Sequence, residues 1–243
     1  MIDLRLGAWQ DALADVGGVD AVSTDPPYSS RTHSGQRTGT SKKVATINYA
    51  CLQDGEPAAF ARHWTQRTRH WIAVFSDHSG AALWEEALVG CGWYVFAPVI
   101  WLRTCPAPRL SGDGPTSAAD YIVVSRPSRP VVDGGSRPGY YLVPSAAGAK
   151  SKGHKVHPGG KDIRAMRPMV GDYTLPGWTV VDPYAGSATT LIAAAELGCQ
   201  AIGAEVDPDT YDKAQERIVK GYTPMPHPRA SKVAGKPVQG ALW

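Results

Sequence analysis

Val181-Asp182-Pro183-Tyr184-Ala185-Gly186-Ser187-Ala188-Thr189-Thr190 is the stretch that decides the fold class of this chain. The residues before it, Trp178 to Val181, predict a strand, and Thr189 to Leu197 predict a helix. A Gly/Ser/Thr turn between a strand and a helix leaves free backbone amides at the helix start, where a nucleotide-like cofactor binds well. Gly186 permits a close approach of the backbone to such a ligand.

An acid follows at the spacing that a nucleotide site requires. Gln200 to Val206 predicts the next strand, and Glu205 lies near its end. In dinucleotide-binding folds an acidic residue about 20 positions after the glycine turn accepts hydrogen bonds from ribose hydroxyls. The distance along the chain from Gly186 to Glu205 matches this rule, and Asp209 to Lys220 then predicts a further helix.

A second stretch with chemical potential lies near the start of the chain: Thr24-Asp25-Pro26-Pro27-Tyr28. The predicted strand Asp20 to Thr24 stops here because two prolines remove two backbone donors. The turn offers a carboxylate, a rigid carbonyl-lined backbone and an aromatic face. Acceptors at the Asp25 carboxylate and the Pro26 carbonyl would localise the lone pair of an exocyclic amine, and Tyr28 would stack on the base that carries it.

Strands and helices alternate along the chain, which predicts an α/β fold with a mostly parallel sheet covered on both faces. We expect one domain over residues 1–220, with a catalytic loop at 29–56, a target-recognition insert at 125–160 and an extended C-terminal tail at 221–243. The other predicted strands are Asp3 to Gly7, His70 to Phe75, Trp93 to Leu102 and Tyr121 to Val124, and the other helices are Trp9 to Val16, Pro57 to Arg69, Gly80 to Val89 and Lys161 to Gly171. Within 125–160, Tyr140 to Val143 is an apolar island in a loop.

Composition excludes several classes of protein. The 243 residues are 43% hydrophobic and 19% charged, which suits a globular domain of this size. The longest apolar stretch, Trp93 to Leu102, is interrupted by Pro98 and too short to span a bilayer, so we expect a cytoplasmic protein without a membrane partner. The four cysteines form no Cys-x-x-Cys pair, and the His154/His157 pair lacks a third ligand, so no metal is expected.

Basic residues collect in the predicted loops although the net charge is only +3. Such segments neutralise backbone phosphates, so we expect a nucleic-acid partner. The candidate nucleic-acid-binding residues are Arg31, Arg37, Lys42, Lys43, Lys150, Lys152 and Lys155.

Both motifs resemble those of the β-class DNA amino-methyltransferases, which methylate adenine N6 or cytosine N4 with S-adenosylmethionine. The order along the chain, with the catalytic motif first, a basic variable region next and the cofactor motif last, is that of the β arrangement. The resemblance covers most of the chain from Leu4 to Ile218. It implies a Rossmann-like methyltransferase fold with a seven-stranded sheet, one antiparallel strand, and both motifs at adjacent strand ends.

The resemblance also assigns site residues. The catalytic turn is Asp25, Pro26, Pro27 and Tyr28, while Asp182 and Gly186 would line the methionine end of the cofactor and Glu205 would hold its ribose. The segment His157-Pro158-Gly159-Gly160-Lys161 resembles the family's His-Pro-x-x-Lys-Pro, whose helix packs beside the methionine moiety. The expected cofactor-binding residues are Gly7, Trp9, His157, Lys161, Asp182, Tyr184, Gly186, Ser187, Thr189 and Glu205.

Two aromatic residues have alternative roles. Gly7-Ala8-Trp9 stands where the family usually has Gly-Asp against the adenine, so Trp9 could stack on the cofactor or lie in the core. Trp101, in a segment similar to the family's aliphatic-Trp-x-Lys, could shape the base pocket or lie in the core.

The sequence therefore predicts a DNA adenine-N6 methyltransferase acting on a flipped-out base in duplex DNA. Cytosine N4 is the alternative, because Asp-Pro-Pro-Tyr serves both bases although Ser-Pro-Pro-Tyr is more usual for cytosine. A catalytically silent nucleic-acid-binding relative is a further alternative, against which the retention of Asp25, Tyr28, Gly186 and Glu205 argues; RNA or a protein glutamine amide are other substrates for such a motif. The recognition site, a homodimer and a cognate nuclease of a restriction-modification pair are left open.

Overall fold

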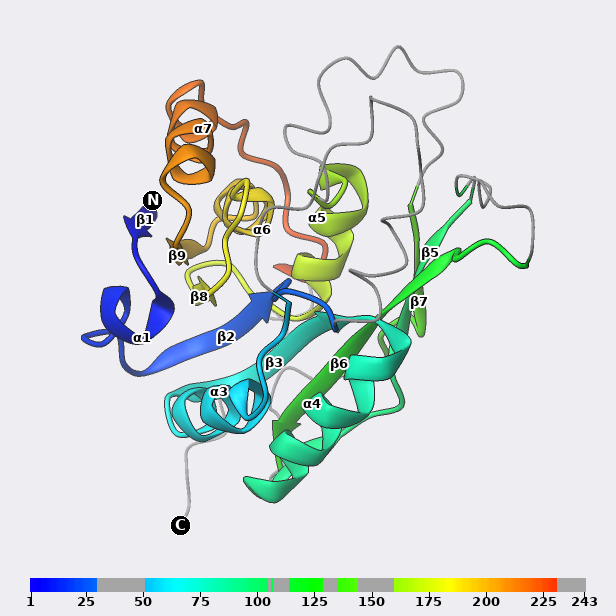
Figure 1. Cartoon of the computed structure of the whole chain (residues 1–243). Helices are drawn as coiled ribbons and strands as arrows, with labels where there is room; N and C mark the ends of the chain where they lie inside the picture. Colours follow the sequence, from blue (N-terminus) through cyan, green and yellow to red (C-terminus); the bar gives the residue numbers. More distant parts are fainter. Residues whose placement is uncertain (30–50, 105, 107–113, 129–134, 144–159, 231–243) are drawn as a thin grey trace, which may run out of the picture.

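The computed structural model describes residues 1–29, 51–104, 106, 114–128, 135–143 and 160–230. They form one nine-stranded sheet with the order β1-β9-β8-β2-β3-β6-β5-β7, and β4 also pairs with β6 (Figure 1). The strands are β1 (Ile2–Leu6), β2 (Val19–Thr24), β3 (Thr68–Ser76), β4 (Trp93–Val95), β5 (Val99–Arg103), β6 (Ala119–Pro127), β7 (Tyr140–Val143), β8 (Thr179–Asp182) and β9 (Gln200–Glu205). The helices are α1 (Trp9–Ala12), α3 (Glu56–Thr65), α4 (His78–Gly90), α5 (Ile163–Asp172), α6 (Thr189–Glu196) and α7 (Pro208–Val219).

The strand directions confirm a mostly parallel sheet. β6 runs antiparallel to β3, β4 and β5, and every other pairing in the described sheet is parallel. The expected count of seven strands is wrong. Pro98, which has no backbone N–H for a ladder, separates β4 from β5 where one strand was predicted, and the apolar island after Gly139 pairs with β5 as the edge strand β7.

Helices cover both faces of the sheet, with α5 and α6 above it and α3 and α4 below it in Figure 1. Side chains along a strand alternate between the faces, so Ala21 packs into the core beneath α5 and α6 while Val22 packs against α3 and α4. Both cores are closed by large side chains, with Met166 and Leu191 on one face and Trp64 and Trp84 on the other. Because both faces are buried, the central strands carry continuous apolar runs, such as Trp71 to Phe75 in β3 and Val180-Val181 in β8.

The central strands β2 and β8 are neighbours, in the register Ala21 to Val180 and Val22 to Val181. From β8 the chain continues through α6 to β9 on one side of this pair. From β2 it continues through α3 to β3 on the other side, and the two helices lie on opposite faces. The carboxyl ends of β2 and β8 therefore meet where the chain order reverses, the place where open α/β sheets bind ligands.

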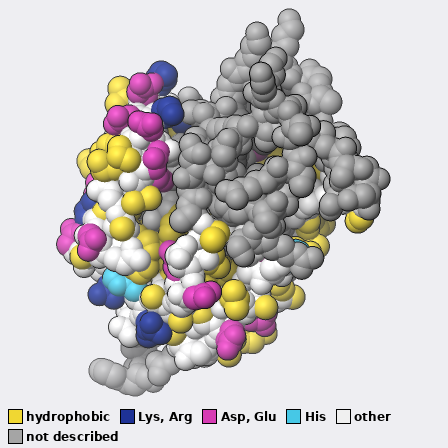
Figure 2. Space-filling view, viewed as in Figure 1, with side chains coloured by type: hydrophobic (Ala, Val, Ile, Leu, Met, Phe, Trp, Pro, Cys, Tyr) yellow, Lys and Arg dark blue, Asp and Glu magenta, His cyan; other side chains and the backbone are white. Residues whose placement is uncertain are grey.

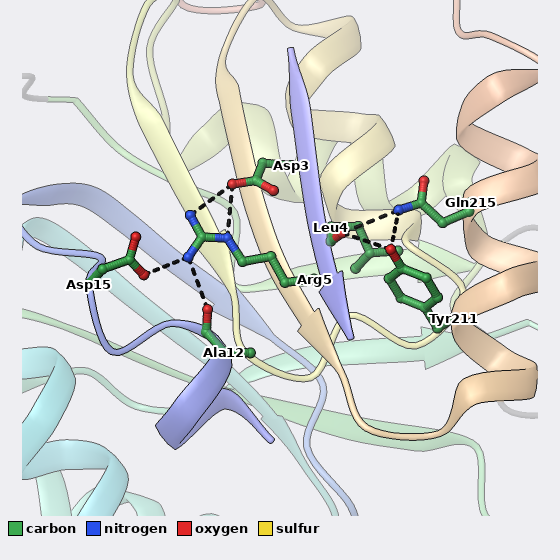
Figure 3. Close-up of polar contacts among 7 residues, drawn as sticks. All are labelled: Asp3, Leu4, Arg5, Ala12, Asp15, Tyr211 and Gln215. Atoms are coloured by element: carbon green, nitrogen blue, oxygen red, sulfur yellow. Dashed lines mark hydrogen bonds and ion pairs between the residues drawn. The ribbon is translucent and has the colours of Figure 1, made fainter. Parts of the chain in front are cut away.

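The edge strand β1 is held from two sides (Figure 3). The Arg5 guanidinium bonds Asp3, Asp15 and the Ala12 carbonyl, which ties β1 to the turn after α1. On the other side Gln215 and Tyr211 of α7 donate to the Leu4 carbonyl at 3.2 Å and 3.4 Å. These contacts cover a strand edge and fix the end of β1 beside β9.

The first ten residues of the expected tail, 221–230, carry no strand but are anchored to the domain. Met225 N donates to the Glu196 carbonyl at 2.8 Å, and His227 and Arg229 are buried. A Cβ on Gly171 would lie 2.7 Å from Pro228 Cγ, so the helix α5 and this segment are in close contact. Residues 221–230 are therefore part of the folded domain rather than a loose extension.

The described surface carries both signs of charge. On the face in Figure 2 acidic and basic side chains of described residues are interspersed, and neither sign gathers into a broad patch there. No helix within the described ranges is both long and apolar enough to cross a membrane. The same residues contain no group of three or more His, Cys, Asp or Glu side chains that could hold a metal ion.

Candidate active site at the ends of β2 and β8

The two predicted motifs are joined by a direct hydrogen bond. Thr24 Oγ1, at the end of β2, donates to Asp182 Oδ1, at the end of β8, at 2.6 Å. Asp182 Oδ1 also accepts from the Tyr184 amide at 3.1 Å, which shapes the turn after β8. Burial raises the pKa of Asp182 to about 7, because the loss of water around the carboxylate outweighs the hydrogen bonds from Thr24, Thr190 and the Tyr184 amide. The buried Asp182 carboxyl group therefore accepts hydrogen bonds from the end of β2 and from the turn after β8, and joins the two.

The catalytic turn contains an ion pair that the sequence did not predict. Lys161 Nζ lies 2.9 Å from Asp25 Oδ1 and donates to the Tyr28 hydroxyl at 2.8 Å. Asp25 Oδ1 is buried, and its contact with the ammonium falls outside hydrogen-bond geometry. Burial raises the pKa of Asp25, and the charge of Lys161 opposes this rise. The carboxylate therefore retains acceptor capacity for another donor.

A second carboxylate approaches the same ammonium. Asp120 Oδ2 lies 3.6 Å from Lys161 Nζ and 2.8 Å from Arg103 Nη1. Asp120 is the second residue of β6, and Arg103 is the last residue of β5. Because β6 runs antiparallel, its first residues lie at the edge where the parallel strands end. The sequence shows Asp120 just before a β-branched run. Only the antiparallel direction of β6 places this acid at the edge where the catalytic turn lies.

Hydrogen bonds also hold the C-terminal end of the catalytic turn, at Tyr28 and Ser29. Ser29 Oγ donates to Asp77 Oδ2 at 2.5 Å, and Asp77 Oδ1 caps α4 by accepting from the Gly80 amide at 2.7 Å. The Leu52 amide donates to the Tyr28 carbonyl at 3.0 Å, which ties together the two ends of residues 30–50. Tyr28 is therefore held by its backbone as well as by its hydroxyl.

The cofactor turn uses backbone amides and one half-buried acid. Glu205 Oε2 accepts from the Gly186 amide at 2.9 Å, and Oε1 accepts from the Asp207 amide at 2.8 Å. Gly186 has φ 50°, and a Cβ there would meet no atom of the described residues within 4 Å, so among these residues its Cα faces open space. This open space beside a carboxylate and the start of α6 fits a nucleoside with a donor hydroxyl pair.

The polar residues after Gly186 face inward to a cation on α7. Arg217 Nη1 donates to the Ser187 carbonyl at 2.9 Å and to Thr189 Oγ1 at 2.8 Å. Ser187 and Thr189 are both buried, so their side chains support the turn. Ala188 has φ 59°, a left-handed conformation that disfavours residues with a Cβ.

Three of the predicted cofactor-binding side chains contact other parts of the protein. Trp9 is 4% exposed and packs against Phe60, and its indole donates to the Tyr184 hydroxyl at 2.9 Å, which in turn donates to Glu56 Oε1 at 2.5 Å. Trp9 is thus buried within the α1/α3 face of the core and Tyr184 packs partly against it, while their contact with the cofactor stays a prediction. Lys161 contacts the catalytic turn instead of the Gly186 turn.

Of the remaining predicted residues, some lie within the described ranges and the others lie outside them. The Gly7 amide donates to the Glu205 carbonyl at 2.8 Å, which sets Gly7 beside the cofactor turn. Trp101 is 2% exposed and packs edge-on against Phe75 at 5.1 Å, so its core role is the correct alternative. The predicted residues outside the described ranges are His157, Arg31, Arg37, Lys42, Lys43, Lys150, Lys152 and Lys155.

The fold and the paired turns define a Rossmann-like methyltransferase. Residues 19–216 match the family model N6_N4_Mtase, described as DNA methylase, so the chain belongs to the DNA amino-methyltransferases. The cofactor of this family is S-adenosylmethionine, and the open space beside Gly186 and Glu205 fits its nucleoside.

Individual relatives agree with this family. The chain is 25% identical to "Putative methylase YubD" of Escherichia coli (strain K12) over 208 residues, 82% of each protein. The M1.HpyAVI–SAM complex has the same fold with a TM-score of 0.65 at 19% identity, over 90% of this chain and 100% of that one. The cytosine-N4-specific PvuII DNA methyltransferase gives 0.62 at 15% identity, over 89% and 86%. The predicted fold class and family are confirmed.

Proposed function

We propose that this protein methylates the exocyclic N6 amine of adenine in DNA, using S-adenosylmethionine. The observation that carries the proposal is the 2.6 Å bond from Thr24 to Asp182, because it joins the end of the Asp-Pro-Pro-Tyr strand to the cofactor strand. The acceptor groups of the one turn and the open space of the other therefore lie at adjacent strand ends.

In this proposal the catalytic turn acts on the amine of the target base. The amine is a poor nucleophile because its lone pair is delocalised into the ring. The Asp25 carboxylate and the Pro26 carbonyl accept its two hydrogens, which localises the lone pair on nitrogen, and Pro27 keeps the turn rigid. Asp25 then takes the proton that the methylated nitrogen releases, and the Tyr28 ring stacks on the base.

The cofactor turn would hold S-adenosylmethionine by residues from β8 and β9. Gly186 gives room for close backbone approach, the Glu205 carboxylate accepts from the ribose hydroxyls, and Asp182 fixes the turn. When bound, the cofactor supplies a methyl group on a positively charged sulfur, ready for transfer to a nucleophile. The solved neighbour M1.HpyAVI in complex with SAM supports this assignment.

Access to the crevice requires that the target base leave the duplex. The basic residues of 30–50 and 144–159 would neutralise phosphates around the flipped nucleotide, and segment 125–160 would read the DNA. Replacing Lys150, Lys152 and Lys155 together by Ser should weaken DNA binding and reduce the slope of log K against log salt by about 2 to 3. An unchanged slope would exclude contact of this segment with phosphates.

The choice of adenine rests on the Asp in Asp-Pro-Pro-Tyr, whereas cytosine N4 is favoured by the likeness to the PvuII enzyme. A silent relative is disfavoured because the chain retains Asp25 and Tyr28 in the catalytic turn and Gly186 and Glu205 in the cofactor turn. The full chain is incubated with labelled S-adenosylmethionine and DNA from a methylation-deficient host, and the nucleosides are separated by mass spectrometry. N6-methyl-2′-deoxyadenosine is the expected product, N4-methyl-2′-deoxycytidine would overturn the base assignment, and no transfer to any DNA would overturn the activity.

A further inference from the structure

Four charged side chains form a chain at the catalytic edge of the sheet: Arg103, Asp120, Lys161 and Asp25. The distances between neighbours are 2.8 Å, 3.6 Å and 2.9 Å. Two positive and two negative charges balance, and little of the two central groups is accessible, with 12% of the Asp120 side chain and 11% of that of Lys161 exposed. A buried ammonium of this kind needs carboxylate partners to remain charged.

The Lys161 ammonium lies between unequal partners. It contacts Asp25 and the Tyr28 hydroxyl at close range, while the rings of Tyr28 and Phe75 lie 4.9 Å away. Asp120 at 3.6 Å is just beyond hydrogen-bond distance. A displacement of the ammonium by less than about 1 Å would therefore convert the Asp120 contact into a hydrogen bond and release Asp25.

We propose that Asp120 is a positioning residue of the methyl-transfer reaction, which holds the Lys161 ammonium so that Asp25 is free to accept a hydrogen bond from the target amine. The inference rests on the proposed function, since it assigns Asp25 to that amine. Arg103 Nη1 donates to Asp120 Oδ2 at 2.8 Å and so orients the carboxylate. Without Asp120, Lys161 has Asp25 as its one carboxylate partner among the described residues and competes with the base for it.

The electrostatics agree with this geometry. Burial opposes the charge on Lys161, but Asp25 and Asp120 outweigh burial and raise the lysine pKa above its ordinary value. The negative charge of Asp120 also contributes to the raised pKa of Asp25. Tyr28 also acts on the pKa of Asp25, and Arg103 acts on the pKa of Lys161.

The test uses Asp120→Asn in the full chain, which keeps the shape of the side chain and removes its charge. We expect kcat for DNA methylation to fall about tenfold with an unchanged KM for S-adenosylmethionine, and the acidic limb of the pH profile to move to lower pH.

The same substitution in a Lys161→Met background should change kcat by less than about twofold, because Asp120 acts through the lysine. Asp120→Glu should restore part of the rate, and Asp172→Asn, which alters another half-buried acid, should leave it unchanged.

A second measurement does not depend on activity. In protein labelled with ¹³C at the lysine ε carbon, the Lys161 resonance, assigned by its absence in Lys161→Met, should titrate at lower pH in Asp120→Asn than in the native chain. An unchanged titration, or an equal loss of kcat in both lysine backgrounds, would overturn the proposal. Absence of methyl transfer by the native chain would overturn the proposed function and leave the titration result intact.

Discussion

The catalytic turn and the cofactor turn lie at adjacent strand ends but are built by different physical means. Around Asp25 the contacts are between charged side chains from β2, β5, β6 and the segment before α5. Around Gly186 they are backbone amides and one carboxylate, and the tightly packed Gly203 lies on the neighbouring strand β9. The comparison indicates that substitutions in the catalytic half change the rate at little cost in stability. Those in the cofactor half should change cofactor affinity or folding.

The largest effect is expected at Asp25. Asp25→Asn should lower kcat by about 10³-fold, because an amide cannot take the proton from the methylated nitrogen. Cofactor binding, measured by calorimetry, should stay within a few fold, since Asp25 lies outside the Gly186 turn. Asp54→Asn, at an exposed acid near the same loop, serves as the control. A variant that retains most of its activity would remove Asp25 from the mechanism.

Asp182 lies between the two halves and should give the strongest pH effect. Its pKa is raised from 3.8 to about 7, so the folded chain binds the proton more tightly than the unfolded chain. The resulting stability is present in full below about pH 4 and is lost as the pH rises through about 7. Its size is about 4 kcal/mol.

The Asn variant lacks this titration. The free energy of unfolding of Asp182→Asn relative to the native chain should therefore increase between about pH 4 and pH 8, measured by urea denaturation. The exposed control Asp212→Asn should give a curve parallel to the native one. If the Asp182→Asn curve is parallel as well, the buried carboxyl group is not protonated in the folded state.

Gly203 tests the packing of the cofactor half. A Cβ there would lie 2.7 Å from Leu191 Cδ1, 3.0 Å from the Asp182 carbonyl oxygen and 3.1 Å from Ala185 Cβ. Gly203→Ala should destabilise the chain by about 1 to 3 kcal/mol through overpacking. Gly90→Ala, at an exposed helix position with nothing within 4 Å, should be neutral or slightly stabilising. Equal melting temperatures for the two variants would contradict the packing argument.

The smallest effect is expected at Glu205. Glu205→Gln should weaken S-adenosylmethionine binding about tenfold, because a charged acceptor of ribose hydroxyls becomes neutral. The rate at saturating cofactor should be retained, in contrast to Asp25→Asn. Calorimetry on the exposed control Asp209→Asn should show native affinity. A loss of kcat without a change in cofactor affinity would contradict the assignment of Glu205 to cofactor binding.

Much of the fold was predictable because it depends on local patterns. The predicted strand after Trp178 and the helix after Ala188 are present as β8 and α6, since hydrophobic periodicity and turn residues act over a few positions. The same patterns failed for β7, a strand of four residues whose partner β5 is distant in the chain. Tertiary pairing stabilises that strand, and its own sequence gave no clear signal.

The sequence by itself determined the two motifs, their order and the family, because each motif carries its chemistry in consecutive residues. The tertiary structure decided that Lys161 joins the catalytic turn, that Asp120 and Arg103 complete the charged chain, and that Trp9 and Trp101 lie in the core. These outcomes depend on strand order, on the reversed direction of β6 and on which face each side chain enters. Such properties arise from contacts between distant segments, which a local sequence pattern does not contain.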